Sequence, residues 1–113
     1  MNVSQLQQKF SRKSLDKGET LFSEGEVGGQ GFIIEVGEIS LYKNDKKTAV
    51  LGEGEVVGVW KVLLDQDERF FTAKATIKTI LFIIPEDYLD AIVKEADPFL
   101  KHCFKQWVRI TTG

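Results

Sequence analysis

The chain has 113 residues, a mass of 12.8 kDa and 42% apolar side chains, values that suit one soluble globular domain. Fifteen basic and seventeen acidic side chains give a net charge of -2. The positive excess that binding to nucleic acid or to an anionic membrane needs is therefore absent. The apolar runs are also far shorter than the roughly 18 residues of a membrane span. We expect a single domain over residues 1–113, without a DNA-binding or catalytic domain, with no nucleic-acid or membrane partner.

The location in the cell is indicated by cysteine usage. Cys103 is the only cysteine and cannot form an intrachain disulfide. Such a composition fits a reducing compartment, so we expect a cytoplasmic protein.

Short segments of different periodicity follow one another along the chain. Spacings of three and four between Val3, Leu6 and Phe10 predict a short amphipathic helix that acts as a lid or packing arm. Nine of the ten glycines then fall between Gly18 and Gly58, where they separate stretches rich in β-branched and aromatic residues. These stretches predict strands at Phe32–Ile34, Glu38–Tyr42, Thr48–Leu51, Phe70–Ala75 and Ile77–Ile84.

The period lengthens after the last of these strands. Pro85 suits a first helical turn, and apolar residues follow on one face at Leu89, Ile92, Val93 and Ala96. Asp97 and Pro98 are a preferred N-cap and first helical residue, so a second helix is expected to run toward Ile110. The pattern predicts a small β-sandwich or roll followed by two helices.

The last predicted helix has an apolar arc of about 180°, wider than packing on one side needs. One sector holds Phe99, Cys103, Trp107 and Ile110, and a second sector holds Leu100, Phe104 and Val108. The second sector is a candidate interface for a second copy of the chain or for an effector protein. The alternative is that both sectors pack inside one domain.

Residue patterns for catalysis or metal binding are scarce. His102 is the only histidine, and its neighbour Cys103 diverges from it by about 100° on a helix, so the two form no dyad. The D-x-D spacing of Asp65 and Asp67 lacks the other ligands of a calcium loop. We expect neither an enzyme nor a bound metal or cofactor.

Four motifs in order resemble the cyclic nucleotide-binding domains of catabolite activator proteins, cyclic-nucleotide-dependent kinases and gated channels. They are Lys17–Gly28, Gly31–Ile39, Leu51–Gly58 and Arg69–Ala75. The resemblance implies a mainly β fold with flanking helices: an eight-stranded β-roll of the double-stranded β-helix or jelly-roll type. The roll is expected over about Ser11–Ile84, with a short N-terminal helix, a cassette helix, and two C-terminal helices over about Pro85–Ile110.

The resemblance also implies a ligand site in the phosphate-binding cassette, which maps to Gly54–Ala75. In the family a glycine and a glutamate open the cassette helix, the glutamate holds the ribose hydroxyl, and an arginine holds the cyclic phosphate. Gly58 and Arg69 match this pattern. Val59 occupies the glutamate position and cannot accept a hydrogen bond. The residues after the arginine, small in the family, are Phe70 and Phe71 here, and Trp60 adds bulk at the helix start.

Two interpretations of this diverged cassette follow. In one, Arg69 binds cyclic AMP, cyclic GMP or a related anion, and Trp60, Phe70 and Phe71 reshape the site. In the other, these aromatic side chains fill the pocket, and Arg69 pairs with an acidic neighbour among Asp65, Asp67 and Glu68. The predicted function is a non-catalytic regulatory module that binds a cyclic nucleotide or related small anion. The alternative is a ligand-free interaction or dimerisation module that uses the last helix.

Overall fold

The computed structural model describes residues 3–59, 68–95, 98–99, 102–103 and 106. The predicted cassette helix with Trp60, and the candidate interface residues Leu100, Phe104 and Val108, lie outside the described residues. The predictions for them therefore stay predictions.

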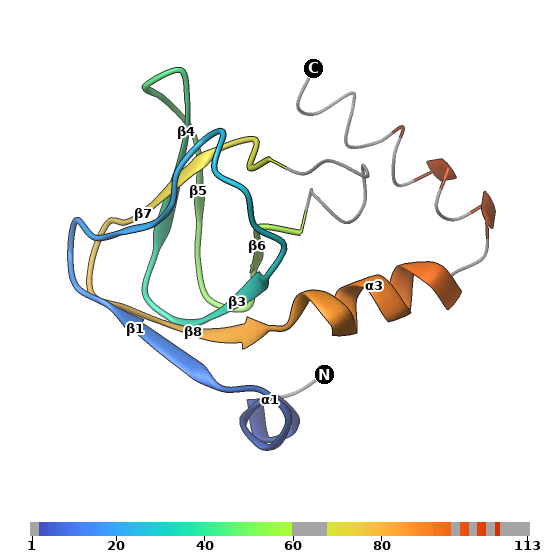
Figure 1. Cartoon of the computed structure of the whole chain (residues 1–113). Coiled ribbons are helices and arrows are strands. Elements are labelled where there is room, and N and C mark those ends of the chain that lie inside the picture. The colour runs from blue at the N-terminus through green and yellow to red at the C-terminus, as the bar shows by residue number, and fades with distance from the viewer. Residues whose placement is uncertain (1–2, 60–67, 96–97, 100–101, 104–105, 107–113) are drawn as a thin grey trace.

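Eight strands form two four-stranded sheets in which every neighbouring pair is antiparallel (Figure 1). The first sheet has the order β1-β8-β3-β6 and the second β2-β7-β4-β5. The expected eight-stranded β-roll is confirmed. The strands are β1 (Arg12–Leu15), β2 (Thr20–Phe22), β3 (Gly31–Val36), β4 (Ile39–Lys43), β5 (Lys46–Leu51), β6 (Val56–Val57), β7 (Thr72–Ala75) and β8 (Thr79–Ile84).

Alternating side chains from both sheets form the core between them. In β3, Phe32 and Ile34 are buried while Ile33 between them is half-buried, and in β7 the exposed Lys74 separates two buried alanines. This alternation is what a strand with one covered face requires. The buried apolar residues of the cluster are Leu15, Phe22, Phe32, Ile34, Ile39, Leu41, Val57, Ala73, Ala75 and Leu81.

Two strands begin two residues later than the sequence predicts. The strand expected from Phe70 starts at Thr72, because the Phe70 carbonyl accepts a hydrogen bond from Lys43 Nζ at 2.9 Å instead of a sheet partner. The strand expected from Ile77 starts at Thr79. Thr79 Oγ1 donates to the Ile77 carbonyl at 2.8 Å, which turns the chain just before the strand.

Two helices lie side by side at one edge of the roll (Figure 1): α1 (Val3–Lys9) and α3 (Glu86–Glu95). Because β1 and β8 are antiparallel neighbours, the helix before β1 and the helix after β8 emerge at the same end. Lys9 Nζ donates to Tyr88 Oη at 2.7 Å, and the Phe10 and Tyr88 rings meet edge to face at 5.3 Å. The predicted N-terminal arm therefore packs against α3.

Beyond α3 the described residues Pro98, Phe99, His102, Cys103 and Gln106 are helical, in agreement with the expected second C-terminal helix. Phe99 is 71% exposed and Cys103 is exposed, so the sector that holds them is uncovered at both positions. None of the helices within the described ranges has the length and hydropathy needed to cross a membrane.

Candidate functional site

Arg69 is the buried cation of the region between β6 and β7. Its side chain is 8% exposed, and its guanidinium group donates to two backbone carbonyls, from Nη1 to Gly58 at 2.8 Å and from Nη2 to Gln30 at 2.9 Å. The guanidinium carbon lies 4.3 Å from the centre of the Phe22 ring, a cation–π distance. These contacts fix the guanidinium plane, and among the described residues they use two of its five N–H donors.

The loop between β2 and β3 is tied to the same arginine through the backbone. Arg69 N donates to the Glu26 carbonyl at 2.8 Å, and Gly25 N donates to the Arg69 carbonyl at 2.9 Å. A Cβ atom at Gly28 would stand 3.3 Å from both Nε and Nη2 of Arg69. The small residue therefore lets the loop approach the guanidinium group closely.

Gly58 also makes room for the arginine. Its φ of 82° lies in the left-handed region that favours glycine, and a Cβ atom there would stand 2.8 Å from Arg69 Nη1. The two residues that match the cassette pattern are thus in direct contact, and each constrains the other.

Electrostatics keep Arg69 charged although it is buried. Burial lowers the pKa of the Arg69 guanidinium below its ordinary value, and the negative charges of Glu26 and Glu86 oppose this shift by raising it. An arginine stays protonated at neutral pH under such conditions. The site therefore presents a permanent positive charge.

The guanidinium group lines a cavity of about 400 Å³, here called the Arg69 cavity. This volume falls in the range of about 300 to 1,000 Å³ that is typical of small-molecule sites. Its walls hold a second cation, Lys13, and two carboxylates. The lining residues are Lys13, Leu21, Phe22, Glu26, Val27, Gly28, Gly29, Gln30, Phe32, Arg69, Ile83 and Glu86.

The remaining predicted site residues take different positions. Val59 packs on β3: a Cβ atom at Gly31 would stand 2.9 Å from Val59 Cγ1. Phe71 packs against the hydrophobic core, and Phe70 lines a smaller cavity of about 220 Å³ on another side of Arg69. Neither phenylalanine lines the Arg69 cavity.

Of the three acidic partners expected for Arg69, one lies in the described part of the chain. Glu68 is exposed, and within the described part of the chain the guanidinium group bonds to carbonyl oxygens and not to the Glu68 carboxylate. The other two candidate partners, Asp65 and Asp67, lie outside the described residues.

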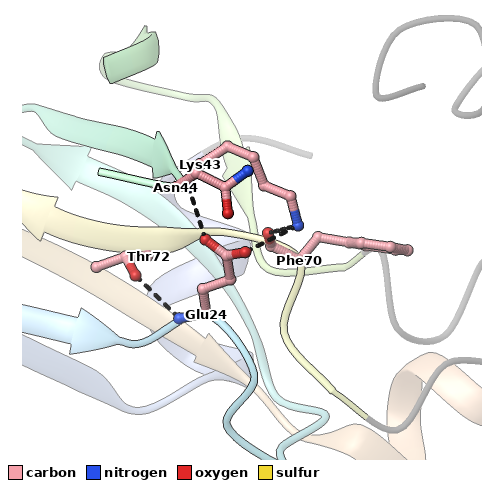
Figure 2. A network of polar contacts seen from close by, with 5 residues as sticks. All are labelled: Glu24, Lys43, Asn44, Phe70 and Thr72. Carbon is pink, nitrogen blue, oxygen red and sulfur yellow. Dashed lines mark hydrogen bonds and ion pairs between the residues drawn. The ribbon is translucent and has the colours of Figure 1, made fainter. Parts of the chain in front are cut away.

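A polar network fixes the chain directly after Arg69 (Figure 2). Lys43 Nζ bonds to the Phe70 carbonyl at 2.9 Å and forms an ion pair with Glu24 at 3.1 Å. Glu24 in turn accepts from Asn44 N at 3.0 Å, and its own backbone N–H donates to Thr72 Oγ1 at 2.9 Å. The hydrogen bonds from Asn44 and Lys43 lower the pKa of Glu24. The turn between β4 and β5 is thereby joined to the start of β7.

Several residues of the site were not among the sequence predictions. Phe22 had no assigned role, Gln30 contributes only a backbone oxygen, and Glu86 belongs to a helix far along the chain. The one signal in the sequence was the closely spaced Gly28, Gly29 and Gly31, which mark a loop that other groups approach closely. Among the described residues, no three His, Cys, Asp or Glu side chains are grouped to hold a metal ion.

Comparison with known proteins identifies the family. The sequence profile of the cyclic nucleotide-binding domain matches residues 12–96. The chain belongs to the cyclic nucleotide-binding domain family. This confirms the resemblance drawn from the glycine motifs and the cassette.

Relatives of this cyclic nucleotide-binding domain occur in larger proteins. The cGMP-dependent protein kinase of Eimeria tenella is 30% identical over 93 residues, which are 82% of this chain and 9% of the kinase. The cyclic AMP receptor protein of Thermus thermophilus is 32% identical over 89 residues, 74% of this chain and 41% of that protein. The chain thus spans less than half the length of either relative.

Solved structures share the fold. The cyclic AMP-bound form of the EAL enzyme Bd1971 matches with a TM-score of 0.80 and 26% identity, over 90% of this domain and 28% of that chain. The catabolite activator protein of Thermus thermophilus matches with a TM-score of 0.70 and 22% identity, over 96% of this domain and 51% of that chain.

Proposed function

We propose that this domain is a non-catalytic regulatory module that binds a cyclic nucleotide, or a related small anion, through Arg69. The observation that carries the proposal is the position of the guanidinium group in the wall of the Arg69 cavity. It is buried, charged and oriented by the carbonyls of Gly58 and Gln30, and its bonds to the described residues use two of its five N–H donors. Such a group suits the recognition of a phosphate.

The placement of two of the three aromatic residues, Phe70 and Phe71, supports binding over a filled pocket. Phe71 is part of the packing around the core, and Phe70 faces the smaller cavity, so neither closes the Arg69 cavity. The matched structures of Bd1971 include a form with cyclic AMP bound. Both observations favour a working anion site in this chain.

Val59 is the departure with the clearest expected effect. It stands where the family has a glutamate for the ribose hydroxyl, and it packs beside Gly31. Without that hydrogen bond, we expect weaker selection for the ribose and a binding energy that depends mainly on the phosphate.

Calorimetric titration tests the proposal. We expect cyclic AMP or cyclic GMP to bind the unaltered domain, and Arg69→Lys to weaken binding about tenfold or more, because lysine loses the planar fork of donors. Arg12→Lys changes an exposed arginine outside the Arg69 cavity and serves as the matched control. Equal affinity in all three proteins would show that Arg69 does not hold the ligand.

A double variant tests the interpretation of the diverged cassette. Val59→Glu together with Phe70→Ser restores the residue types of the family. Neither position lines the Arg69 cavity, so we expect any gain in cyclic nucleotide binding to come from the cassette side of Arg69, where these two departures would otherwise weaken it. Absence of heat at high ligand concentration, with the double variant folded, would contradict this explanation.

A second candidate function is a ligand-free interaction module that uses the last helix. The observation in its favour is that the helix presents an apolar side chain to solvent: Phe99, in the neighbouring sector, is 71% exposed. The proposed interface consists of Leu100, Phe104 and Val108, with a second copy or an effector protein as partner. Light scattering at high protein concentration is expected to show a dimer for the unaltered chain and a monomer for Phe104→Glu. A monomer for the unaltered chain would rule out the homodimer.

Exclusion of a nucleic-acid partner stays a prediction from composition. One matched structure is the N-terminal domain of a transcriptional regulator from Streptomyces coelicolor, at 22% identity. This likeness shows the shared fold alone.

A further inference from the structure

The first turn of α3 enters the wall of the Arg69 cavity. Glu86, the first residue of the helix, lines this cavity together with Arg69. Its carboxylate occupies the space that a side chain at Gly29 would need, because a Cβ atom there would overlap the Glu86 carboxyl group. The absence of a side chain at Gly29 therefore admits this carboxylate into the cavity.

A second contact one turn along fixes the same face of the helix. Leu89 lies three residues after Glu86, so the two side chains share a face of α3. A Cβ atom at Gly31 would stand 3.0 Å from Leu89 Cδ1 and 2.9 Å from Val59 Cγ1. Gly29 and Gly31 therefore leave room for the side chains of Glu86 and Leu89, which share one face of α3.

The two carboxylates in the Arg69 cavity differ in how they are held. Glu26 belongs to the loop before β3, where its side chain accepts a hydrogen bond from Ser23 N at 3.0 Å. Glu86 is carried by a helix. Both negative charges act on Arg69, as the opposing shift of the Arg69 pKa shows. An anion that enters the cavity meets both charges.

We propose that Glu86 is a specificity-determining residue whose carboxylate competes with an anionic ligand for Arg69. This inference rests on the proposed function, because it concerns the same cavity. Two negative groups near one guanidinium repel each other in a site of low dielectric constant. The charge of Glu86 is therefore expected to lower the affinity of the Arg69 cavity for an anion.

The proposal predicts the effect of removing the charge while keeping the shape. Glu86→Gln is expected to raise the affinity for an anion at Arg69 about tenfold, within the usual range of such couplings. Asp87→Asn is the matched control, since Asp87 is the next residue of α3, is exposed and does not line the cavity. It makes the same change in net charge and is expected to alter the affinity less than twofold.

Gly29→Ala provides an independent variant without a change in charge. Its Cβ atom would push the Glu86 carboxylate out of the cavity, so we expect tighter anion binding here as well. If one of the two variants does not fold, the other still tests the competition.

The experiment is a titration of the full chain with inorganic phosphate and, separately, with cyclic AMP, followed by the Nε–Hε nuclear magnetic resonance signal of Arg69. Tighter binding of either probe in Glu86→Gln but not in Asp87→Asn supports the inference. If phosphate alone shows this ranking and cyclic AMP binds none of the proteins, the competition stands and the proposed function fails. If cyclic AMP binds the unaltered chain and Glu86→Gln equally, the competition is wrong and the proposed function stands. If neither probe binds any protein, both are overturned.

Discussion

Arg69 Nη1 donates a hydrogen bond of 2.8 Å to the carbonyl oxygen of Gly58, so the two ends of the segment between β6 and β7 are joined directly. The left-handed backbone of Gly58 and the buried guanidinium group depend on each other in this contact. The carbonyl of Gln30 and the ring of Phe22 complete the support of the arginine. The contacts of Arg69 at the candidate ligand site therefore also connect the two sheets.

Loss of the Arg69 side chain is expected to destabilise the domain. Arg69→Ala removes two charge-assisted hydrogen bonds and a ring contact from a site that is 8% exposed, so we expect a loss of about 3 kcal/mol in the free energy of unfolding. Urea denaturation measures it. Arg12→Ala, which breaks an ion pair whose arginine side chain is 47% exposed, is expected to cost less than about 1 kcal/mol. Equal losses would contradict the structural role of Arg69.

A pair of glycine substitutions separates backbone strain from crowding. Gly54 and Gly58 both have a φ of 82°, yet a Cβ atom at Gly54 meets nothing within 4 Å, whereas one at Gly58 approaches Arg69 Nη1. Gly54→Ala is expected to cost about 1 kcal/mol through strain alone, and Gly58→Ala about 1 to 2 kcal/mol more. Thermal denaturation of both variants measures the difference. If the two variants melt together, the close approach to Arg69 has no energetic effect.

The network around Glu24 is expected to make stability depend on pH. Hydrogen bonds from Asn44 and Lys43 lower the pKa of Glu24 in the folded state below its ordinary value. Its charged form therefore stabilises the fold above that value, and this contribution is lost as the pH falls through the lowered pKa. The difference in urea midpoint between the unaltered domain and Glu24→Gln should shrink between pH 7 and pH 3.

Glu53→Gln is the control for this pH dependence. It removes the same charge from an exposed turn before β6, outside the network of Figure 2. A difference for Glu24→Gln that stays constant over the same pH range would contradict the role of its charge.

Local patterns in the sequence predicted most of the strands and the helices. The β-branched and aromatic residues of Phe32–Ile34, bounded by glycines, predicted β3, and the helical spacing after Pro85 predicted α3. The ends of strands were less predictable. The start of β7 depends on Lys43, whose bond to the Phe70 carbonyl joins residues 27 positions apart.

The candidate site was predictable only where family motifs mark it. Gly58 and Arg69 were identified from the resemblance, and the structure brings them into contact. Gln30 acts through its backbone carbonyl, which leaves no trace in residue type. Glu86 reaches the cavity because β8 ends beside β3, a relationship that only the sheet order reveals.

The central claim is that Arg69 holds a cyclic nucleotide, and a thermal shift with cyclic AMP and, separately, cyclic GMP tests it most directly. Ligand at one hundred times its dissociation constant stabilises a protein by about 2.7 kcal/mol. Each kcal/mol moves the melting midpoint of a domain of about this size by roughly 4 to 8 °C. We predict a rise of roughly 10 °C or more with one of the two nucleotides, absent in Arg69→Lys. No shift with either nucleotide at millimolar concentration, or an equal shift in Arg69→Lys, would contradict the claim.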